Sequence, residues 1–253
     1  DDLIAYRVAP THFLLVVNAG NREDAYAWLK EREIRGSEVR DASDDYAMLA
    51  VQGPASLEAL GLADAPGFSH AMGELDGIEV MVCRTGYTGE RGVELICPAE
   101  DAEALWDAVV ARGATPCGLA ARDTLRLEVC YPLHGNDITQ ETDAISAGLA
   151  WTCALDKDFT GVNVLREVKE RGPAERLVAF VMEEKAVPRN GMAIVGGGRV
   201  TSGTHSPSLD VGIGLAYVPA ASAAVGTEIV VDVRGKERRA RVVKKPIYRH
   251  RSP

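Results

Sequence analysis

Residues 78–106 read IEVMVCRTGYTGERGVELICPAEDAEALW, and this stretch decides the fold of the first part of the chain. Two apolar runs, Ile78 to Arg84 and Gly92 to Cys97, flank a turn with three glycines, which predicts a pair of antiparallel strands. The chain then enters Glu100-Asp101-Ala102, where acids occupy a first turn and apolar residues begin to recur every three or four positions. This pattern predicts a one-sided helix that ends near Gly113.

The same plan occurs earlier in the chain. Strand-like segments at Leu3 to Tyr6 and His12 to Asn18 precede Glu23-Asp24-Ala25, which again opens a helix. We interpret the two stretches as a degenerate internal duplication. Helices packed on one face of antiparallel strands predict an α+β layer architecture.

The second part of the chain has a different texture. A charged helix predicted around Val164 to Arg171 ends at Gly172-Pro173, and short β-rich segments separated by glycine or proline follow it. Such spacing predicts a small antiparallel barrel or sandwich. We therefore expect two domains, residues 1–165 and 174–253. The predicted strands of the second domain are Leu177 to Met182, Met192 to Val195, Arg199 to Ser202, Gly212 to Val218, Glu228 to Val233 and Arg238 to Val243.

Composition excludes several classes of protein. The 253 residues carry a net charge of -9, which argues against a broad surface for nucleic acid or for an anionic membrane. The longest aliphatic run, Phe13 to Val17, is too short to span a bilayer. The five cysteines form no C-x-x-C pair and the histidines show no ligand spacing, so the sequence predicts no disulfide framework and no metal site. A reducing compartment, the cytoplasm or the mitochondrial matrix, fits this cysteine usage.

One acid on an apolar strand indicates a site. Glu94 stands in Val93-Glu94-Leu95-Ile96, and a buried carboxylate costs several kcal/mol unless donors satisfy it. Arg122, on a helix predicted over Gly118 to Cys130, is one candidate donor, and a donor-rich ligand is the other. A structural ion pair between Glu94 and Arg122 stays open on these residues alone.

The start of the chain is abrupt, because Asp1 leads at once into a strand-like segment without a basic or apolar leader. We expect an amino-terminal part to be absent from this sequence.

Six ordered motifs, spread from end to end, together resemble the T-protein of the glycine cleavage system, a tetrahydrofolate-dependent aminomethyltransferase. They are Asp1-Asp2-Leu3-Ile4, Val16-Val17-Asn18-Ala19, Ala50-Val51-Gln52-Gly53-Pro54, Gly86-Tyr87-Thr88-Gly89-Glu90, Gly118 to Glu128 and Thr201 to Leu209. The resemblance implies a duplicated ferredoxin-like folate-binding region followed by a small antiparallel β-barrel domain.

The resemblance also implies a reaction. In that family the enzyme takes an aminomethyl group from the lipoyl arm of the H-protein, releases ammonia and passes the one-carbon unit to tetrahydrofolate, which becomes 5,10-methylenetetrahydrofolate. Positive charge develops at the reacting carbon and at a folate nitrogen, so an aimed carboxylate stabilises the transition state. The resemblance places that catalytic carboxylate at Asp2, beside folate N10. From the sequence alone, Asp2 also reads as a frayed acidic terminus.

The remaining roles follow from the same resemblance. Glu94 would accept two parallel hydrogen bonds from the pterin N3–H and 2-amino groups, and Arg122 would hold the other edge of the pterin. Tyr87 and Trp151 would form walls of the pocket, although core aromatics are the ordinary alternative for both. The resemblance implies that Val17 and Asn18 contribute further contacts to the folate. The T-protein is expected to act as a monomer.

Two other functions stay open on the sequence. One is a related folate-dependent demethylase, or the folate module of a demethylating dehydrogenase, which the lack of a G-x-G-x-x-G segment disfavours. The other is a non-catalytic folate-binding accessory protein, whose Lys-Gly-Cys-Tyr motif the chain lacks. A docking surface for the acidic H-protein is expected at a local cluster of bases. The alternative is that these bases lie on an exposed strand edge, where their charges prevent pairing with another strand. That cluster is Arg234, Lys236, Arg238 and Arg239.

Overall fold

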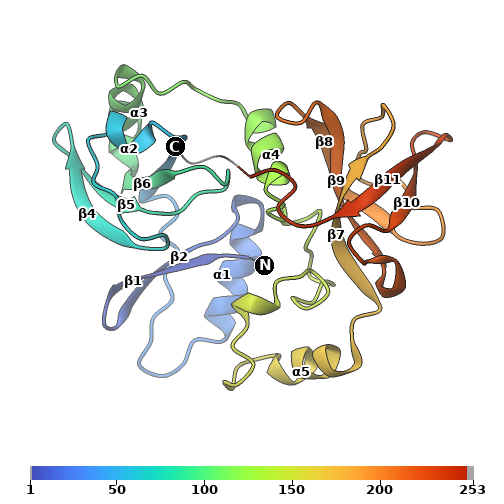
Figure 1. Ribbon diagram of the computed structural model, residues 1–253. Helices are drawn as coiled ribbons and strands as arrows, with labels where there is room; N and C mark the ends of the chain where they lie inside the picture. The colour runs from blue at the N-terminus through green and yellow to red at the C-terminus, as the bar shows by residue number, and fades with distance from the viewer. Residues whose placement is uncertain (1, 250–253) are drawn as a thin grey trace. The chain divides into compact units, whose positions relative to one another are not determined.

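The computed structural model describes residues 2–249. These residues form two compact units, 2–118 and 119–249 (Figure 1). Each unit has its own apolar core. The expected domains, 1–165 and 174–253, are a different division of the chain and stay a prediction.

A four-stranded antiparallel sheet with the order β3–β6–β5–β4 forms the centre of the first unit. The strand register sets Glu94 opposite Ala50 on one side and Cys83 on the other. Because side chains alternate between the faces of a strand, Glu94 shares its face with Ile96, and Val93 and Leu95 point the other way. The strands are β3 (Tyr46–Gln52), β4 (His70–Leu75), β5 (Ile78–Cys83) and β6 (Gly92–Pro98).

Helices cover one face of this sheet. The short α2 (Ser56–Ala59) and the longer α3 (Ala102–Ala111) contribute Leu57 and Leu105 to a buried cluster with Val93 and Leu95 (Figure 1). The 3-10 turn η2 (Ala99–Asp101) leads into α3. The predicted one-sided helix is therefore present, and its apolar side faces the sheet.

A two-stranded ribbon covers part of the other face. Its strands β1 (Ile4–Ala9) and β2 (His12–Val16) pair antiparallel, and Tyr6 is buried in one cluster with Met81, Cys83 and Ile96. The 3-10 turn η1 (Ala19–Asn21) and helix α1 (Arg22–Glu31) follow. Ribbon, sheet and helices are thus three layers, and Glu94 lies on the face of the sheet that receives the ribbon.

The second unit is built on a five-stranded antiparallel sheet with the order β10–β11–β7–β9–β8. All five strands contribute to one buried cluster around Phe180 and Val231, so the sheet is curled around its own core. Helix α4 (Leu119–Glu128) packs Leu127 against the opposite side of β7 and β9. The strands are β7 (Glu175–Met182), β8 (Arg199–Ser206), β9 (Val211–Pro219), β10 (Glu228–Asp232) and β11 (Glu237–Val243).

Shorter elements complete the second unit. They are η3 (Ala150–Thr152), α5 (Val162–Arg171) and η4 (Ala220–Ser222). The three glycines 196–198 all have positive φ and make a hairpin turn, as their sequence predicts. At Gly198 a Cβ would stand 2.2 Å from the Tyr217 carbonyl oxygen, so no larger residue fits there.

The predicted α+β fold class and the carboxyl-terminal antiparallel sheet are confirmed. Two differences stand out. The segment predicted as a strand at Met192 to Val195 forms only isolated bridges at Ala193 and Ile194, because Gly191 and Gly196 bend the chain at both ends. The strands β3 and β4 have no counterpart in the sequence expectations.

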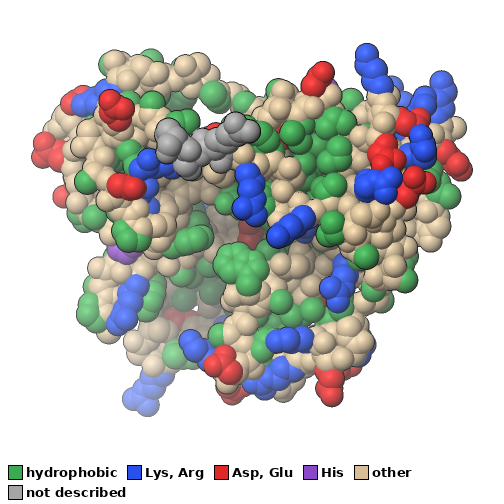
Figure 2. Space-filling model, in the orientation of Figure 1, with side chains coloured by type: hydrophobic (Ala, Val, Ile, Leu, Met, Phe, Trp, Pro, Cys, Tyr) green, Lys and Arg blue, Asp and Glu red, His purple; other side chains and the backbone are tan. Residues whose placement is uncertain are grey.

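The edge formed by β10 and β11 carries acids as well as bases. Arg238 and Arg239 both bond Glu184, at 2.9 and 3.4 Å, and Arg241 pairs with Glu183. In Figure 2 the Lys and Arg side chains lie among Asp and Glu side chains at the upper right, over β10 and β11. These pairs lower the positive potential of the expected basic cluster, so the edge attracts an acidic partner less than its composition predicts.

Candidate functional site

Asp2 is held in place at the start of β1. The Asn18 side-chain amide donates one hydrogen bond to the Asp2 carbonyl oxygen at 3.0 Å and another to the Asp2 carboxylate Oδ1 at 2.9 Å. Asp2 and Asn18 are both half-buried. A carboxylate fixed by an amide of known position is a better electrostatic element than a frayed terminal residue, which is the alternative interpretation of Asp2.

Glu94 is half-buried, and its described partner is a hydroxyl. The Thr85 Oγ1 donates to Glu94 Oε2 at 2.5 Å, and the Tyr6 hydroxyl lies 2.8 Å from the same Thr85 oxygen. A chain of hydrogen bonds therefore runs from the ribbon to the sheet and ends on the carboxylate. Sequence reasoning names Glu94 and overlooks Tyr6 and Thr85. The available signal is that Tyr6 carries the one polar side-chain tip within the strand Leu3 to Tyr6.

The residues around this chain of hydrogen bonds are shielded from solvent. Tyr6 is 3% exposed, and burial raises the pKa of its phenol above the usual range. Burial likewise raises the pKa of the Cys83 thiol to about 11, with the nearby negative charge of Glu94 acting in the same direction. Both groups are consequently neutral at physiological pH, which makes Tyr6 a permanent hydrogen-bond donor.

Gln52 fixes the glycine-rich loop between β5 and β6. Its amide nitrogen donates to the Thr85 carbonyl at 3.2 Å and to the Val93 carbonyl at 2.9 Å, and its amide oxygen accepts from Thr88 Oγ1 at 3.2 Å. At Gly92 a Cβ would stand 2.5 Å from the Val51 carbonyl oxygen, which explains why a glycine is needed there. This loop carries Tyr87, which is half-buried.

A groove of about 1090 Å³ lies beside the ribbon in the first unit. It is lined by β2, α1, residues 36–43 and β3, and includes Val17 and Ile96. Val17 directly precedes Asn18, and Ile96 shares the face of β6 with Glu94. The groove thus adjoins the residues that hold the two acids, although neither acid belongs to its lining.

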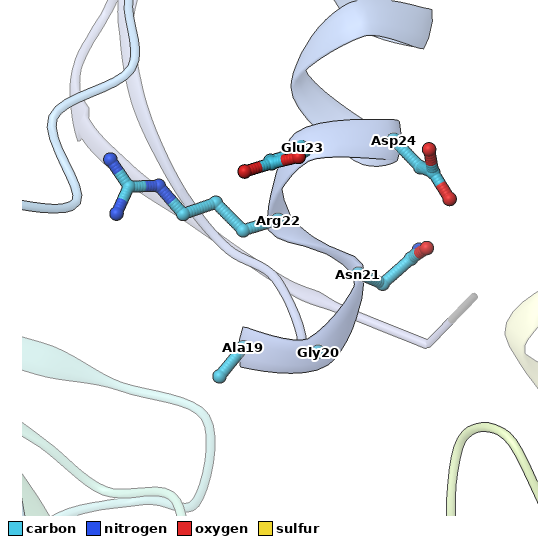
Figure 3. Close-up of a pocket in the computed structure, with 6 residues that line it drawn as sticks. All are labelled: Ala19, Gly20, Asn21, Arg22, Glu23 and Asp24. Carbon is cyan, nitrogen blue, oxygen red and sulfur yellow. The ribbon is translucent and has the colours of Figure 1, made fainter.

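A smaller hollow of about 270 Å³ surrounds η1 and the start of α1. Figure 3 shows Arg22 extending away from Asn21 and Asp24, and its guanidinium pairs with Asp41 and Asp44. Hydrogen bonds from Ser43, together with Arg22, lower the pKa of Asp41 to about 2. Glu23 and Asp24 place negative charge in the first turn of α1, so the hollow is unsuited to an anionic ligand.

The second unit contains the other two predicted site residues. Arg122 lies on α4 and is exposed. Arg126, one turn later on the same helix, points inward and is 2% exposed. Trp151, in η3, is 76% exposed, so the alternative that it is a core aromatic is wrong.

Arg126 belongs to a buried polar network of the second unit. Its guanidinium donates to Asp137 Oδ2 at 2.8 Å and to Ser202 Oγ at 2.9 Å, and Thr201 Oγ1 donates to Asp137 Oδ1 at 2.5 Å. The side chains of Arg126 and Asp137 are 2% and 0% exposed. The structural role expected for Arg126 is consistent with these contacts, but the network lies in the core and not on a helix surface.

Glu128 is held in the same way. Ser206 Oγ donates to Glu128 Oε1 at 2.5 Å, and Ser208 Oγ donates to Oε2 at 2.9 Å. The polar motif Thr201 to Leu209 therefore binds buried carboxylates of the second unit. The sequence does not show this function because the partners are 64 to 80 positions apart.

Within residues 2–249 no group of three or more His, Cys, Asp or Glu side chains could hold a metal ion. Among the same residues, no helix combines the length and the apolar character that crossing a bilayer requires.

Comparison with known proteins follows the two parts of the chain. A family model described as the GCVT N-terminal domain matches residues 1–157. A second, described as the glycine cleavage T-protein C-terminal barrel domain, matches residues 175–249.

Individual proteins give the same result. The chain is 44% identical over 265 residues to an aminomethyltransferase of Flavobacterium psychrophilum, which covers 98% of this chain and 74% of the relative. It is 45% identical over 266 residues to one of Geobacillus kaustophilus, with coverage of 98% and 73%. A solved structure, the glycine cleavage system aminomethyltransferase T from Bartonella henselae, superposes with a TM-score of 0.87 at 34% identity over 98% of this chain and 72% of that chain.

Proposed function

Because the chain belongs to the glycine cleavage T-protein family and is an aminomethyltransferase, we propose that tetrahydrofolate is its acceptor and the lipoyl arm of the H-protein its donor. The reaction then moves a one-carbon unit from the aminomethyl group to tetrahydrofolate, releases ammonia and forms 5,10-methylenetetrahydrofolate. The demethylase and the accessory-protein alternatives are not favoured by these relatives.

The proposal assigns the electrostatic role to Asp2. Its carboxylate, fixed by Asn18, would stand beside folate N10, where positive charge develops as the one-carbon unit is transferred. Asn18 sets the orientation of the carboxylate, and Val17 adds an apolar contact from the adjoining groove. An acid that is already oriented needs no reorganisation when the charge appears.

Glu94 is assigned to the pterin ring. The N3–H and 2-amino groups of the ring are parallel donors, and a carboxylate accepts both in a charge-assisted geometry. We assign Arg122 to the other edge of the ring, and Tyr87 and Trp151 to the walls of the pocket. Trp151 is 76% exposed, so its indole is accessible to a ligand, as this assignment requires.

The observation that carries the proposal is that the first unit holds both acids on connected elements. Asp2 precedes β1, and Tyr6 on β1 reaches Glu94 through Thr85. An extended chain rises about 3.3 Å per residue, so Asp2 and Tyr6 are about 13 Å apart along the strand. A ligand that extends along β1 could contact both acids, as a folate would in this proposal.

Location and partner complete the proposal. All five cysteines are free, which supports a reducing compartment such as the bacterial cytoplasm. The H-protein is proposed as a transient partner and the enzyme as a monomer. The expected domain division into 1–165 and 174–253 also belongs to the proposal, and limited proteolysis between residues 165 and 174 would test it.

The substitution Glu94→Gln tests the assignment to the pterin. Because one charged hydrogen-bond acceptor is lost, we expect tetrahydrofolate affinity to fall by about 1.5 to 3 kcal/mol in a calorimetric titration. Glu103→Gln makes the same charge change on α3, where the side chain is exposed, and serves as the control. Equal affinity of the Glu94→Gln variant and the parent protein would remove Glu94 from the folate site.

A further inference from the structure

The hydrogen-bond chain that ends on Glu94 has a single direction. Thr85 Oγ1 has one proton and donates it to Glu94 Oε2. The Tyr6 hydroxyl, 2.8 Å from the same oxygen, must therefore be the donor in its contact with Thr85. Each hydroxyl donates its own proton to the next oxygen. The two hydrogen bonds therefore form a relay, directed from Tyr6 on the ribbon through Thr85 to the Glu94 carboxylate.

Both hydroxyls are shielded from solvent. Tyr6 and Thr85 are 3% and 8% exposed, and a hydroxyl buried without a partner is costly. The Tyr6 ring is itself fixed by packing, edge to face against His70 with 5.5 Å between ring centroids. The relay therefore starts from a rigid residue, and rotation of the Glu94 carboxylate would break it.

We propose that Tyr6 and Thr85 are positioning residues for folate binding, which hold the Glu94 carboxylate in the orientation that accepts the paired pterin donors. This inference rests on the proposed function of Glu94. It adds that the ribbon, and not only the sheet, determines pterin affinity. Preorganised acceptors bind more tightly because less side-chain freedom is lost when the ligand arrives.

The relay also connects the two acids of the proposed site. Tyr6 lies four positions after Asp2 on the same extended segment, and its hydroxyl contacts Thr85 at 2.8 Å. Removing the Tyr6 hydroxyl would break the hydrogen bond between the ribbon and Thr85, while the apolar contacts of the Tyr6 ring with the sheet stay. The pair of hydroxyls is thus a polar link between the ribbon and the partner of Glu94.

A purely structural role is the rival explanation, and matched variants separate the two. Tyr6→Phe and Thr85→Val each remove one hydroxyl while preserving shape, and Thr85→Ser restores the donor. Tyr217→Phe is the control, because its hydroxyl is also buried and bonded, to the Asp137 carbonyl at 3.0 Å in the second unit. All variants are titrated with tetrahydrofolate kept reduced, and thermal unfolding is recorded for each.

Thr85→Val and Tyr6→Phe should raise the dissociation constant for tetrahydrofolate on the order of tenfold, and Thr85→Ser should stay within about twofold of the parent. Tyr217→Phe should lose similar thermal stability without this loss of affinity. In a Glu94→Ala background, Thr85→Val should have no further effect, because the group that it positions is gone.

The outcomes distinguish the inference from the function on which it rests. If Glu94→Gln weakens binding while Tyr6→Phe and Thr85→Val do not, the relay is merely structural and the inference is overturned. If Glu94→Gln itself leaves affinity unchanged, the proposed function of Glu94 fails first. Should Thr85→Val not fold, Tyr6→Phe alone decides, since its ring keeps the contacts of the core.

Discussion

At Asp2, a single amide fixes a residue that the sequence alone also allows to be a frayed acidic end. The two hydrogen bonds from Asn18 hold both the backbone and the carboxylate of Asp2. A side chain held in this way keeps its charge at one place, which is the condition for electrostatic stabilisation of a transition state.

The substitution Asp2→Asn tests that role. Because it removes the charge and nearly preserves the shape, we expect kcat to fall roughly 100-fold or more while the dissociation constant for tetrahydrofolate stays within a few-fold. Single-turnover rates with aminomethylated H-protein and a folate titration provide the two values. Asp24→Asn, on the exposed first turn of α1, is the control. Unchanged turnover of Asp2→Asn would refute the electrostatic role.

At the scale of elements, the loop between β5 and β6 depends on a residue from a third strand. Gln52, at the end of β3, bonds both ends of this loop and Thr88 within it. A loop that carries Tyr87 and is entered from Thr85 thereby becomes part of the sheet. The loop is held rigid by the hydrogen bonds of the Gln52 side chain and by the close approach of Gly92 to the Val51 carbonyl oxygen.

Gln52→Ala should therefore act on stability and on the site together. Two backbone carbonyls would lose their donor, so the free energy of unfolding should fall by about 1 to 3 kcal/mol in a urea titration. Gln140→Ala, at an exposed position, is the matched control and should change stability by less than about 0.5 kcal/mol. If Gln52→Ala lowers the free energy of unfolding no more than Gln140→Ala does, the Gln52 side chain does not stabilise the loop.

At the scale of the whole molecule, each unit contains a buried thiol with a raised pKa. Burial raises the pKa of Cys83 to about 11 in the first unit and that of Cys130 to about 11 in the second. In the unfolded chain the pKa of a thiol lies near its ordinary value of 9.0. The folded protein then binds more protons than the unfolded one in the window between these values, so stability falls as pH rises through it.

We expect a decrease on the order of 1 kcal/mol for each thiol between pH 9 and pH 11. Urea unfolding at pH 8 and pH 10.5 measures it, and Cys130→Ala should show a smaller pH dependence than the parent. The exposed Cys117 provides the control through Cys117→Ala, which should keep the full dependence. A parent protein that is equally stable at both pH values would contradict this expectation.

Much of the fold could be predicted from local pattern. Period-two and helical spacing are properties of neighbouring residues, so most strands and the helices α1, α3, α4 and α5 were accessible from the sequence. The ends of Met192 to Val195 were misjudged because glycine conformations, not residue hydrophobicity, limit that segment. The strand β3 is missed because its partner β6 is distant in the chain. The strand β4 pairs with the adjacent β5 through the turn at Asp76-Gly77, a local signal that the sequence analysis overlooks.

The sequence by itself determined the fold class and the family, because composition, periodicity and ordered motifs all lie in the order of residues. It also predicts Asp2 and Glu94 as the acids of the proposed site. Only the tertiary structure decided which side chains form hydrogen bonds with these acids. Asn18 reaches Asp2 from 16 positions away and Thr85 reaches Glu94 from 9 positions away. Tyr6 acts on Glu94 through Thr85, which lies 79 positions further along the chain. Such contacts depend on how the ribbon packs on the sheet. This packing is determined by the burial of apolar surface over the whole unit, which no local sequence pattern reveals.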